Sequence, residues 1–155
     1  MKSRDVQPRR VRLCAYEARH IETLDSYDKL TWSSGEKCQQ GDIQVFCISL
    51  RGSRHFEGDQ RKIDAVHSIW EATSQLVVRS TDPGWPWQAT FRLLVRLESP
   101  VPKRLLFGDI LPAERWPQSY KGKFLRGKQI TQLASVLSKR NPRQKIEIRS
   151  ALEVV

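Results

Sequence analysis

Short apolar segments with the character of β-strands recur along this chain, and polar stretches rich in turn-forming residues separate them. The clearest segment is IQVFCISL at residues 43–50, and two more follow at residues 64–80 and 90–99. Valine, isoleucine and aromatic residues are frequent in these segments, as is typical of strands. The chain has 155 residues, which is enough for one domain with a hydrophobic core and too few for two of ordinary size. We therefore expect one domain built around a sheet.

The remaining segments divide the chain further. Residues 1–10 are polar and basic and predict a flexible arm, so the domain is expected to span residues 11–155. Apolar positions at helical spacing predict helices at residues 20–30 and 128–140, and alternation predicts a last strand at residues 144–155. This pattern indicates an α/β (α+β) domain, a small curved sheet or barrel with two or three short helices packed outside it. The residues expected in its core are Phe46, Ile48, Trp70, Leu93 and Val95.

The charge balance is strongly basic. The chain carries 27 lysines and arginines against 17 acidic residues, which gives a net charge of +10 and an isoelectric point near 10.0. Lys and Arg release condensed counterions when they contact phosphates, so this balance points to nucleic acid as the partner. No apolar run approaches the roughly 18–20 residues of a membrane span, and no basic amphipathic helix is visible. A membrane partner is therefore not expected.

The N-terminus is charged and lacks the apolar stretch of a secretory signal. Cys14, Cys38 and Cys47 are odd in number and form no CxxC pair. These features predict a cytoplasmic, intracellular protein with reduced thiols and without a disulfide framework or a zinc site.

No group of residues has a catalytic pattern. His20, His55 and His67 are far apart in the sequence and lack the context of metal or nuclease motifs, and there is no glycine-rich phosphate loop. Asp42 and Asp109 follow glycines at turns, where aspartate usually shapes the backbone. The sequence thus predicts a protein that is not an enzyme and needs no cofactor and no metal.

The tryptophans fall into two groups. Trp70 and Trp116 are expected to pack on the core. Trp32, Trp85 and Trp87 lie in segments rich in serine, glycine and proline, where a chain usually runs over the surface. Exposed indoles there offer flat faces to nucleobases, and each stacked base contributes about 1–3 kcal/mol. Two facing indoles would enclose one base, and a methyl group on that base would fill apolar space. The alternative is that Trp85 or Trp87 folds back over the core.

A basic run precedes the helix expected at residues 128–140. It interleaves the four cations Lys121, Lys123, Arg126 and Lys128 with aromatic residues and glycines. Such a run is able to follow a phosphate backbone and to offer backbone N–H groups near a helix start. These four residues are the predicted phosphate contacts, and an ordinary solvated face is the alternative.

Four segments follow one another in a recognisable order. They are LTWSS at residues 30–34, GDIQVF at 41–46, GWPW at 84–87 before the strand FRLLV, and the basic, glycine-containing segment at 121–137 that leads into a helix. In this order they resemble the PUA-like superfamily, specifically the branch that contains the YTH and EVE domains. The resemblance covers roughly residues 11–140 and implies a PUA-like curved sheet or barrel that binds nucleic acid bearing a modified base.

The resemblance also implies roles for individual residues. It makes Trp32 one wall of a base cage and Trp85, with Trp87 as the alternative, the second wall. Ser33 is expected beside the edge of the base. Arg19 stands where YTH domains carry other polar residues at the base edge, and this departure leaves the identity of the modified base open.

Prokaryotic members of this branch are often encoded with modification-dependent restriction enzymes. The resemblance therefore implies a specificity module whose ligand is nucleic acid with a methylated base, DNA being favoured over RNA, and whose partner is a nuclease domain or subunit. Three alternatives stay open: a YTH-like RNA-binding module, a small ASCH-type nuclease and a protein-interaction module with a tryptophan-rich surface. The chain lacks the G-x-K-x-x-E-x-R signature of ASCH-type nucleases.

Overall fold

The computed structural model describes residues 10–33, 38–74, 77–78, 87–106 and 123–154. The strands are β1 (Val11–Tyr16), β2 (Lys29–Ser33), β3 (Ile43–Ile48), β4 (Ala65–Ala72), β5 (Val77–Val78), β6 (Trp87–Pro102) and β7 (Lys123–Phe124). The α-helices are α1 (Ile21–Ser26), α2 (Gly127–Arg140) and α3 (Lys145–Ala151). Short 3-10 helices are η1 (Ala18–His20), η2 (Ser53–His55), η3 (Gln60–Lys62), η4 (Lys103–Leu105) and η6 (Pro142–Gln144).

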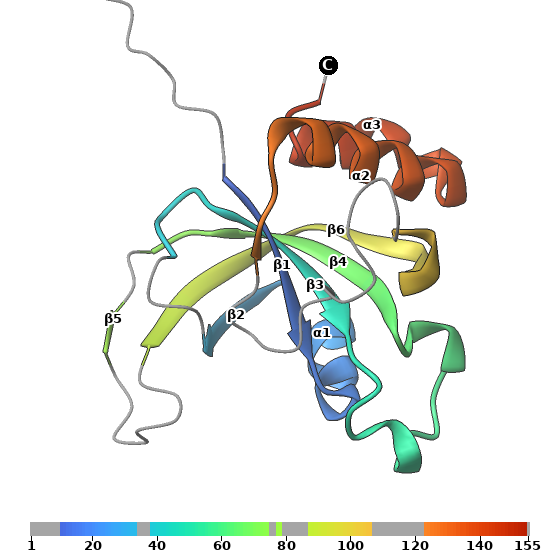
Figure 1. Ribbon diagram of the computed structural model, residues 1–155. Coiled ribbons are helices and arrows are strands. Elements are labelled where there is room, and N and C mark those ends of the chain that lie inside the picture. Colours follow the sequence, from blue (N-terminus) through green and yellow to red (C-terminus); the bar gives the residue numbers. More distant parts are fainter. Residues whose placement is uncertain (1–9, 34–37, 75–76, 79–86, 107–122, 155) are drawn as a thin grey trace, which may run out of the picture.

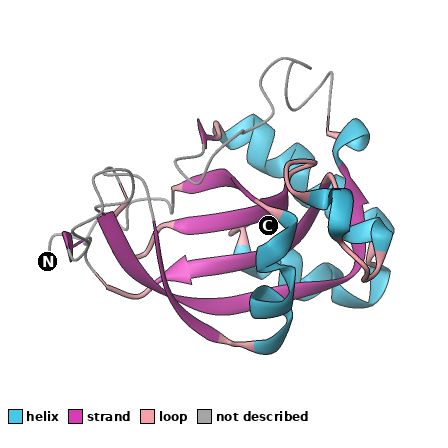
Figure 2. Ribbon diagram, turned by 90° about the horizontal axis from the view of Figure 1, so that it is seen from below, coloured by secondary structure: helices cyan, strands magenta, loops and turns pink. Residues whose placement is uncertain are grey.

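One curved sheet contains all of these strands, in the order β2-β6-β4-β3-β1-β7, with β5 paired to β6 (Figures 1 and 2). β1 and β3 run parallel, and the other pairs are antiparallel. The long strand β6 joins the parts of the sheet, since it pairs with β2, β4 and β5.

The start of the parallel pair is fixed by Arg10 and Asp42. The guanidinium of Arg10 donates to both carboxylate oxygens of Asp42, at 2.9 and 2.6 Å, and its carbonyl accepts from the backbone N–H of Ile43 at 2.8 Å. Gly41 turns the chain into β3 with a φ of +92°, a conformation that favours glycine. The predicted role of Asp42 in shaping the backbone is confirmed.

Both faces of the sheet are covered. In β1, Val11 and Leu13 pack on one face and Cys14 and Tyr16 on the other. The first face packs against α2 and α3, which lie side by side over it (Figure 1). The second face packs against α1.

The sheet curls until its second face closes on itself. The ring of Tyr16 in β1 lies 5.5 Å from that of Trp32 in β2, although these strands are four places apart in the sheet. Register shifts along the β3–β4 and β4–β6 pairs mark bulges, which bend strands and increase their twist. The predicted fold, an α+β curved sheet with short helices outside it, is confirmed.

The predicted core is largely confirmed, since Phe46, Ile48, Trp70 and Val95 are buried and Leu93 is half-buried. Leu93 and Val95 are two residues apart, so a regular strand would place both on one face. The register shift between them sends Leu93 to the second face and Val95 to the first.

Two predicted elements were wrong in extent or type. The helix expected at residues 20–30 ends at Ser26, because the backbone is extended at Tyr27 and β2 begins at Lys29. Residues 144–155 were expected to form a strand, but residues 145–151 form α3.

The error in α3 has a simple origin. Ile146 and Ile148 alternate with charged residues as in a strand, yet Ile146 is 84% exposed and only Ile148 is buried. Ile148, Ala151 and Leu152 are the residues that pack on the first face, and their spacing is helical.

Candidate nucleic-acid interface

Trp32 lies in β2, a strand at the edge of the sheet, and its side chain is half-buried against the second face. Tyr16 and His20 approach its indole almost at right angles, with ring centroids at 5.5 and 4.9 Å and interplanar angles of 83° and 81°. Among the described residues, no ring lies parallel to this indole. Tyr16 and His20 therefore fix its direction without stacking on its faces.

Buried aromatic rings support this position. The ring of Tyr16 lies 4.6 Å from that of Phe46, which stacks on Trp70 at 5.6 Å with an interplanar angle of 19° and meets Phe91 at 6.1 Å. Phe46, Trp70 and Phe91 are fully buried. Trp32 thus rests on closely packed aromatic side chains of the core, and its direction is set before any ligand arrives.

The sequence did not mark Tyr16 or His20 as site residues. Tyr16 ends a strand and His20 ends a short turn, and only the curl of the sheet brings both to Trp32. Burial lowers the pKa of His20, and the neighbouring charge of Arg19 lowers it further. The imidazole is therefore neutral at pH 7 and places no charge beside the indole.

Arg19, a predicted base contact, lies in η1 next to His20, and its side chain is exposed. Its Nε lies 3.0 Å from Oε2 of Glu17, which also faces Arg51 at 3.6 Å. The structure therefore places Arg19 beside the rings, with Glu17 as its described partner. Its role at a base edge stays a prediction.

Trp87 opens β6 on the same face as Trp32. Trp87 and Ala89 are two residues apart in β6, so their side chains project from the same face of the sheet. Trp32 of β2 is paired with Ala89 and therefore projects from that face too. Diagonal neighbours of this kind are about 7–8 Å apart, within reach of aromatic side chains. The register thus brings Trp87, half-buried, to the neighbourhood of Trp32.

Two other predicted base contacts are described in part or not at all. Ser33 continues β2 opposite Gln88, and its side chain lies outside the described part of the structure. Trp85 lies outside the described residues.

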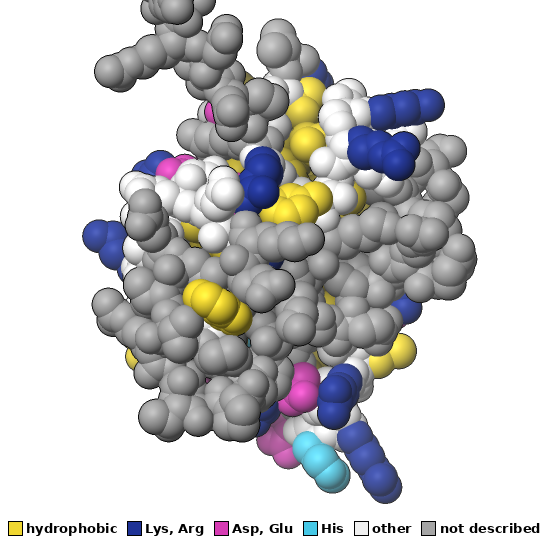
Figure 3. Space-filling model, turned by 60° about the vertical axis from the view of Figure 1, so that its left-hand side comes forward, with side chains coloured by type: hydrophobic (Ala, Val, Ile, Leu, Met, Phe, Trp, Pro, Cys, Tyr) yellow, Lys and Arg dark blue, Asp and Glu magenta, His cyan; other side chains and the backbone are white. Residues whose placement is uncertain are grey.

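The basic run is divided between β7 and the start of α2. Lys123 pairs with Leu13 through its backbone, Arg126 and Lys128 are exposed at the start of α2, and Lys121 lies outside the described residues. The first turn of α2 contains no acidic residue. β7 and β2 stand at opposite ends of the strand order, but the curl of the sheet brings the ring of Tyr16, in the neighbouring strand β1, to 5.5 Å from that of Trp32. On the face in Figure 3, the described Lys and Arg side chains are spread around the margin.

Other reactive side chains are buried. Ser68, His67 and Asp25 are hydrogen-bonded in the order that serine hydrolases use, but Ser68 is 0% and His67 2% exposed. Burial raises the pKa of the Cys14 and Cys47 thiols, which keeps them protonated. Among the described residues, no three His, Cys, Asp or Glu side chains are grouped to hold a metal ion. Within this same part of the chain, no helix is long and apolar enough to span a membrane.

The fold has counterparts among solved structures. The YTH domain of the MRB1 protein of Zygosaccharomyces rouxii, solved in complex with N6-methyladenosine RNA, is 14% identical to this chain. The match covers 88% of this chain and 90% of that one, with a TM-score of 0.50. The NMR structure of Rpa0253 from Rhodopseudomonas palustris is 15% identical over 60% of this chain and 66% of that one. Its TM-score is 0.39, which is too low to indicate a shared fold.

No family model matches the chain, and no curated protein matches it. At 14% identity, the likeness to the YTH domain concerns the fold and not the ligand. The chain therefore shares its α+β fold with this YTH domain.

Proposed function

We propose that this protein binds nucleic acid and holds one modified base against Trp32. The observation that carries the proposal is the setting of this indole: Tyr16 and His20 hold it edge-on, and no described ring stacks on it. A half-buried indole with a fixed direction loses little side-chain freedom when a base stacks on it. The fold shared with the YTH domain and the net charge of +10 support the same reading.

Trp87 is the proposed second wall among the described residues, and Trp85 is its alternative. A flat ring between two indoles needs a van der Waals contact of about 3.5–4.0 Å on each side. Diagonal neighbours in a sheet are about 7–8 Å apart, which matches twice that contact distance. A methyl group in this space would displace water from apolar surface, so the modified base gains most.

Arg126 and Lys128 are proposed to contact phosphates, with Lys121 and Lys123 of the same run. Cations in the first turn of a helix are unfavourable beside the positive end of its dipole, and α2 has no acidic residue there to offset them. A bound phosphate would relieve this repulsion and accept from backbone N–H groups of the first turn.

The ligand is proposed to be a methylated base in RNA or DNA. The YTH neighbour was solved with N6-methyladenosine RNA, which makes methylated RNA the first ligand to test. Methylated DNA, together with a nuclease partner in an EVE-like restriction system, is the second form of the proposal. In both forms the protein supplies recognition, and any chemistry belongs to a partner.

The decisive experiment compares affinities for short oligonucleotides, RNA and DNA, single- and double-stranded, with unmodified and methylated adenine or cytosine. Trp32→Ala should weaken binding of the preferred modified oligonucleotide by about 1–3 kcal/mol, the range of base–aromatic stacking, and unmodified binding by much less. Trp32→Phe should retain part of the preference, because a smaller ring still stacks. Tyr27→Ala, at an exposed aromatic residue, is the matched control and should behave as the parent.

Trp87→Ala and Trp85→Ala assign the second wall, because only one should reduce the preference as Trp32→Ala does. If the parent prefers no modified base in any of these oligonucleotides, the proposed function is wrong. If Trp32→Ala keeps the full preference while remaining folded, the base is bound elsewhere.

A further inference from the structure

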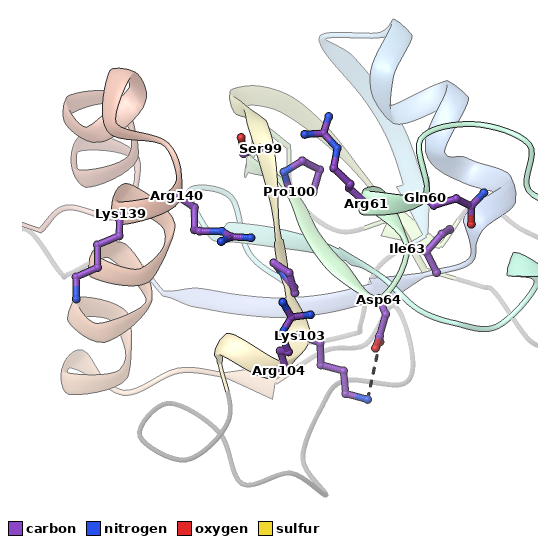
Figure 4. Close-up of a pocket in the computed structure, with 11 residues that line it drawn as sticks. Gln60, Arg61, Ile63, Asp64, Ser99, Pro100, Lys103, Arg104, Lys139 and Arg140 are labelled. Atoms are coloured by element: carbon purple, nitrogen blue, oxygen red, sulfur yellow. Dashed lines mark ion pairs between the residues drawn. The ribbon is translucent and has the colours of Figure 1, made fainter.

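A basic groove lies at the other end of β6 from Trp32 (Figure 4). It has a volume of about 680 Å³ and is bordered by η3, the start of β4, the end of β6, η4 and the end of α2. Arg61, Lys103, Arg104, Lys139 and Arg140 line it, and Asp64 is the acidic residue among its described lining residues. We name this cavity the basic groove.

The walls of the basic groove are held together by hydrogen bonds from two side chains to backbone groups. Asn141, 2% exposed, accepts from the backbone N–H of Ser99 at 2.7 Å and donates to the carbonyls of Ser99 and Leu137 at 3.0 and 3.1 Å. Gln144 accepts from the backbone N–H of Glu98 at 2.9 Å and donates to the carbonyl of Arg96 at 2.8 Å. The end of α2, with Lys139 and Arg140, is thereby fixed to β6, and η4, with Lys103 and Arg104, follows β6 directly.

The charges of the basic groove are only partly compensated. Lys103 lies 3.8 Å from Asp64, and Arg61 pairs with Asp59 at 2.7 Å. Within the described part of the chain, Arg104, Lys139 and Arg140 form no ion pair. In Figure 4, Arg140 extends from α2 toward β6, whereas Lys139 runs along the helix.

A simple structural role accounts for part of this arrangement. Lys139 and Arg140 stand in the last turn of α2, where cations complement the helix dipole. That role does not extend to Arg104 or Arg61, which come from η4 and η3. Three separate elements therefore bring guanidinium groups to one fixed groove, and planar guanidinium groups suit phosphate oxygens.

We propose that the basic groove binds phosphodiester groups of a nucleic-acid backbone, as a second contact region separate from Trp32. Ala89, opposite Trp32, and Pro102, in the groove, are thirteen residues apart in β6. The two regions therefore lie toward opposite ends of β6, at less than the roughly 40 Å of a regular strand, because seven steps of β4 pair with eleven steps of the bulged β6. The groove therefore adds affinity that is independent of the captured base and requires no modification.

The test compares two double variants with equal loss of charge. Arg104→Gln/Arg140→Gln removes two groove cations, and Arg54→Gln/Arg143→Gln removes two exposed cations outside it. Binding of an unmodified oligonucleotide of about twenty nucleotides is measured over a range of salt concentrations. Each lost phosphate contact lowers the log–log salt slope by about 0.7–0.9, so the groove variant should lose up to about 1.4–1.8 and the control far less. Equal slopes for the two variants would overturn the proposal.

Inorganic tripolyphosphate distinguishes the backbone from free phosphate compounds. If tripolyphosphate binds the parent and not the groove variant while oligonucleotide binding is the same in both, the groove takes free phosphates and the backbone proposal is wrong. Trp32→Ala should keep the parent's salt slope, and the groove variant should keep the parent's ratio of modified to unmodified affinity. The proposed function and the groove thus fail in different measurements.

Discussion

At the scale of single residues, four side chains form one directed chain of hydrogen bonds beneath the aromatic core. The indole N–H of Trp70 donates to Oγ of Ser68 at 2.7 Å, Oγ of Ser68 lies 2.8 Å from Nδ1 of His67, and Nε2 of His67 lies 2.7 Å from Oδ1 of Asp25. In the neutral tautomer with the proton on Nε2, Nε2–H donates to Asp25 and Nδ1 accepts from Ser68. Lys62 donates to the other oxygen of Asp25 at 2.6 Å. Each group is satisfied only when His67 is neutral, because its Nδ1 must accept.

This chain predicts a loss of stability on mild acidification. Burial lowers the pKa of His67, and its hydrogen bond to Asp25 opposes this only in part. The unfolded chain therefore binds more protons below about pH 6.5, so the stability is fully present above that pH and falls as the pH drops through the folded pKa. His20, whose pKa burial also lowers, acts in the same direction. Urea unfolding at pH 7.5 and 5.5 should show this fall.

His67→Gln should reduce the fall, and His20→Gln/His67→Gln should reduce it further. If the free energy of unfolding of the double variant falls as much between pH 7.5 and 5.5 as that of the parent, other titrating groups cause the loss of stability. As the pH is lowered, binding that depends on Trp32 should persist until His20 becomes protonated. A charged imidazole would then lie edge-on to the indole, with ring centroids 4.9 Å apart.

At the scale of elements, the side chain of Asn141 connects α2 to β6. Asn141→Ala should lower the free energy of unfolding by about 1–3 kcal/mol, because the partly buried N–H and carbonyl of Ser99 lose their partner. Arg143→Ala, two residues on and exposed, is the control and should stay within about 0.5 kcal/mol of the parent. Equal effects of the two changes in urea unfolding would show that Asn141 contributes nothing specific.

The same scale separates what the sequence predicts from what it does not. β3, β4, β6 and α2 were predicted because their apolar residues repeat at the period of the element they form. The bulge that parts Leu93 from Val95 leaves no such pattern, and the alternation of Ile146 with Ile148 is misleading because only one of them is buried. The local setting of Trp32 predicted a surface segment, but Trp32 lies half-buried in the edge strand β2, and its role at a base stays a prediction. Its contacts with Tyr16 and His20 were not predicted, since they depend on the curl of the whole sheet.

At the scale of the whole molecule, positive charge is expected to act from two separate regions. Arg126→Gln/Lys128→Gln should weaken the binding of modified and unmodified oligonucleotides alike. It should also lower the log–log slope of affinity against salt concentration by up to about 1.4–1.8. The two regions share no residue, so combining these changes with Arg104→Gln/Arg140→Gln should give nearly additive losses. If the combined variant binds oligonucleotides no more weakly than either double variant alone, both regions serve one contact.

The strand order also bears on synthesis at the ribosome. Among the described strands, β2 pairs with β6 alone, and about sixty residues separate Ser33 from Arg92 at the end of that pairing. At about 5–20 residues per second, β2 waits roughly 3–12 s for its partner to be made. An unpaired edge can accept a strand from another chain. The strand that carries Trp32 thus waits longer for its partner than β1, β3 or β4 does, and crowded polysomes are where its misassembly should first appear.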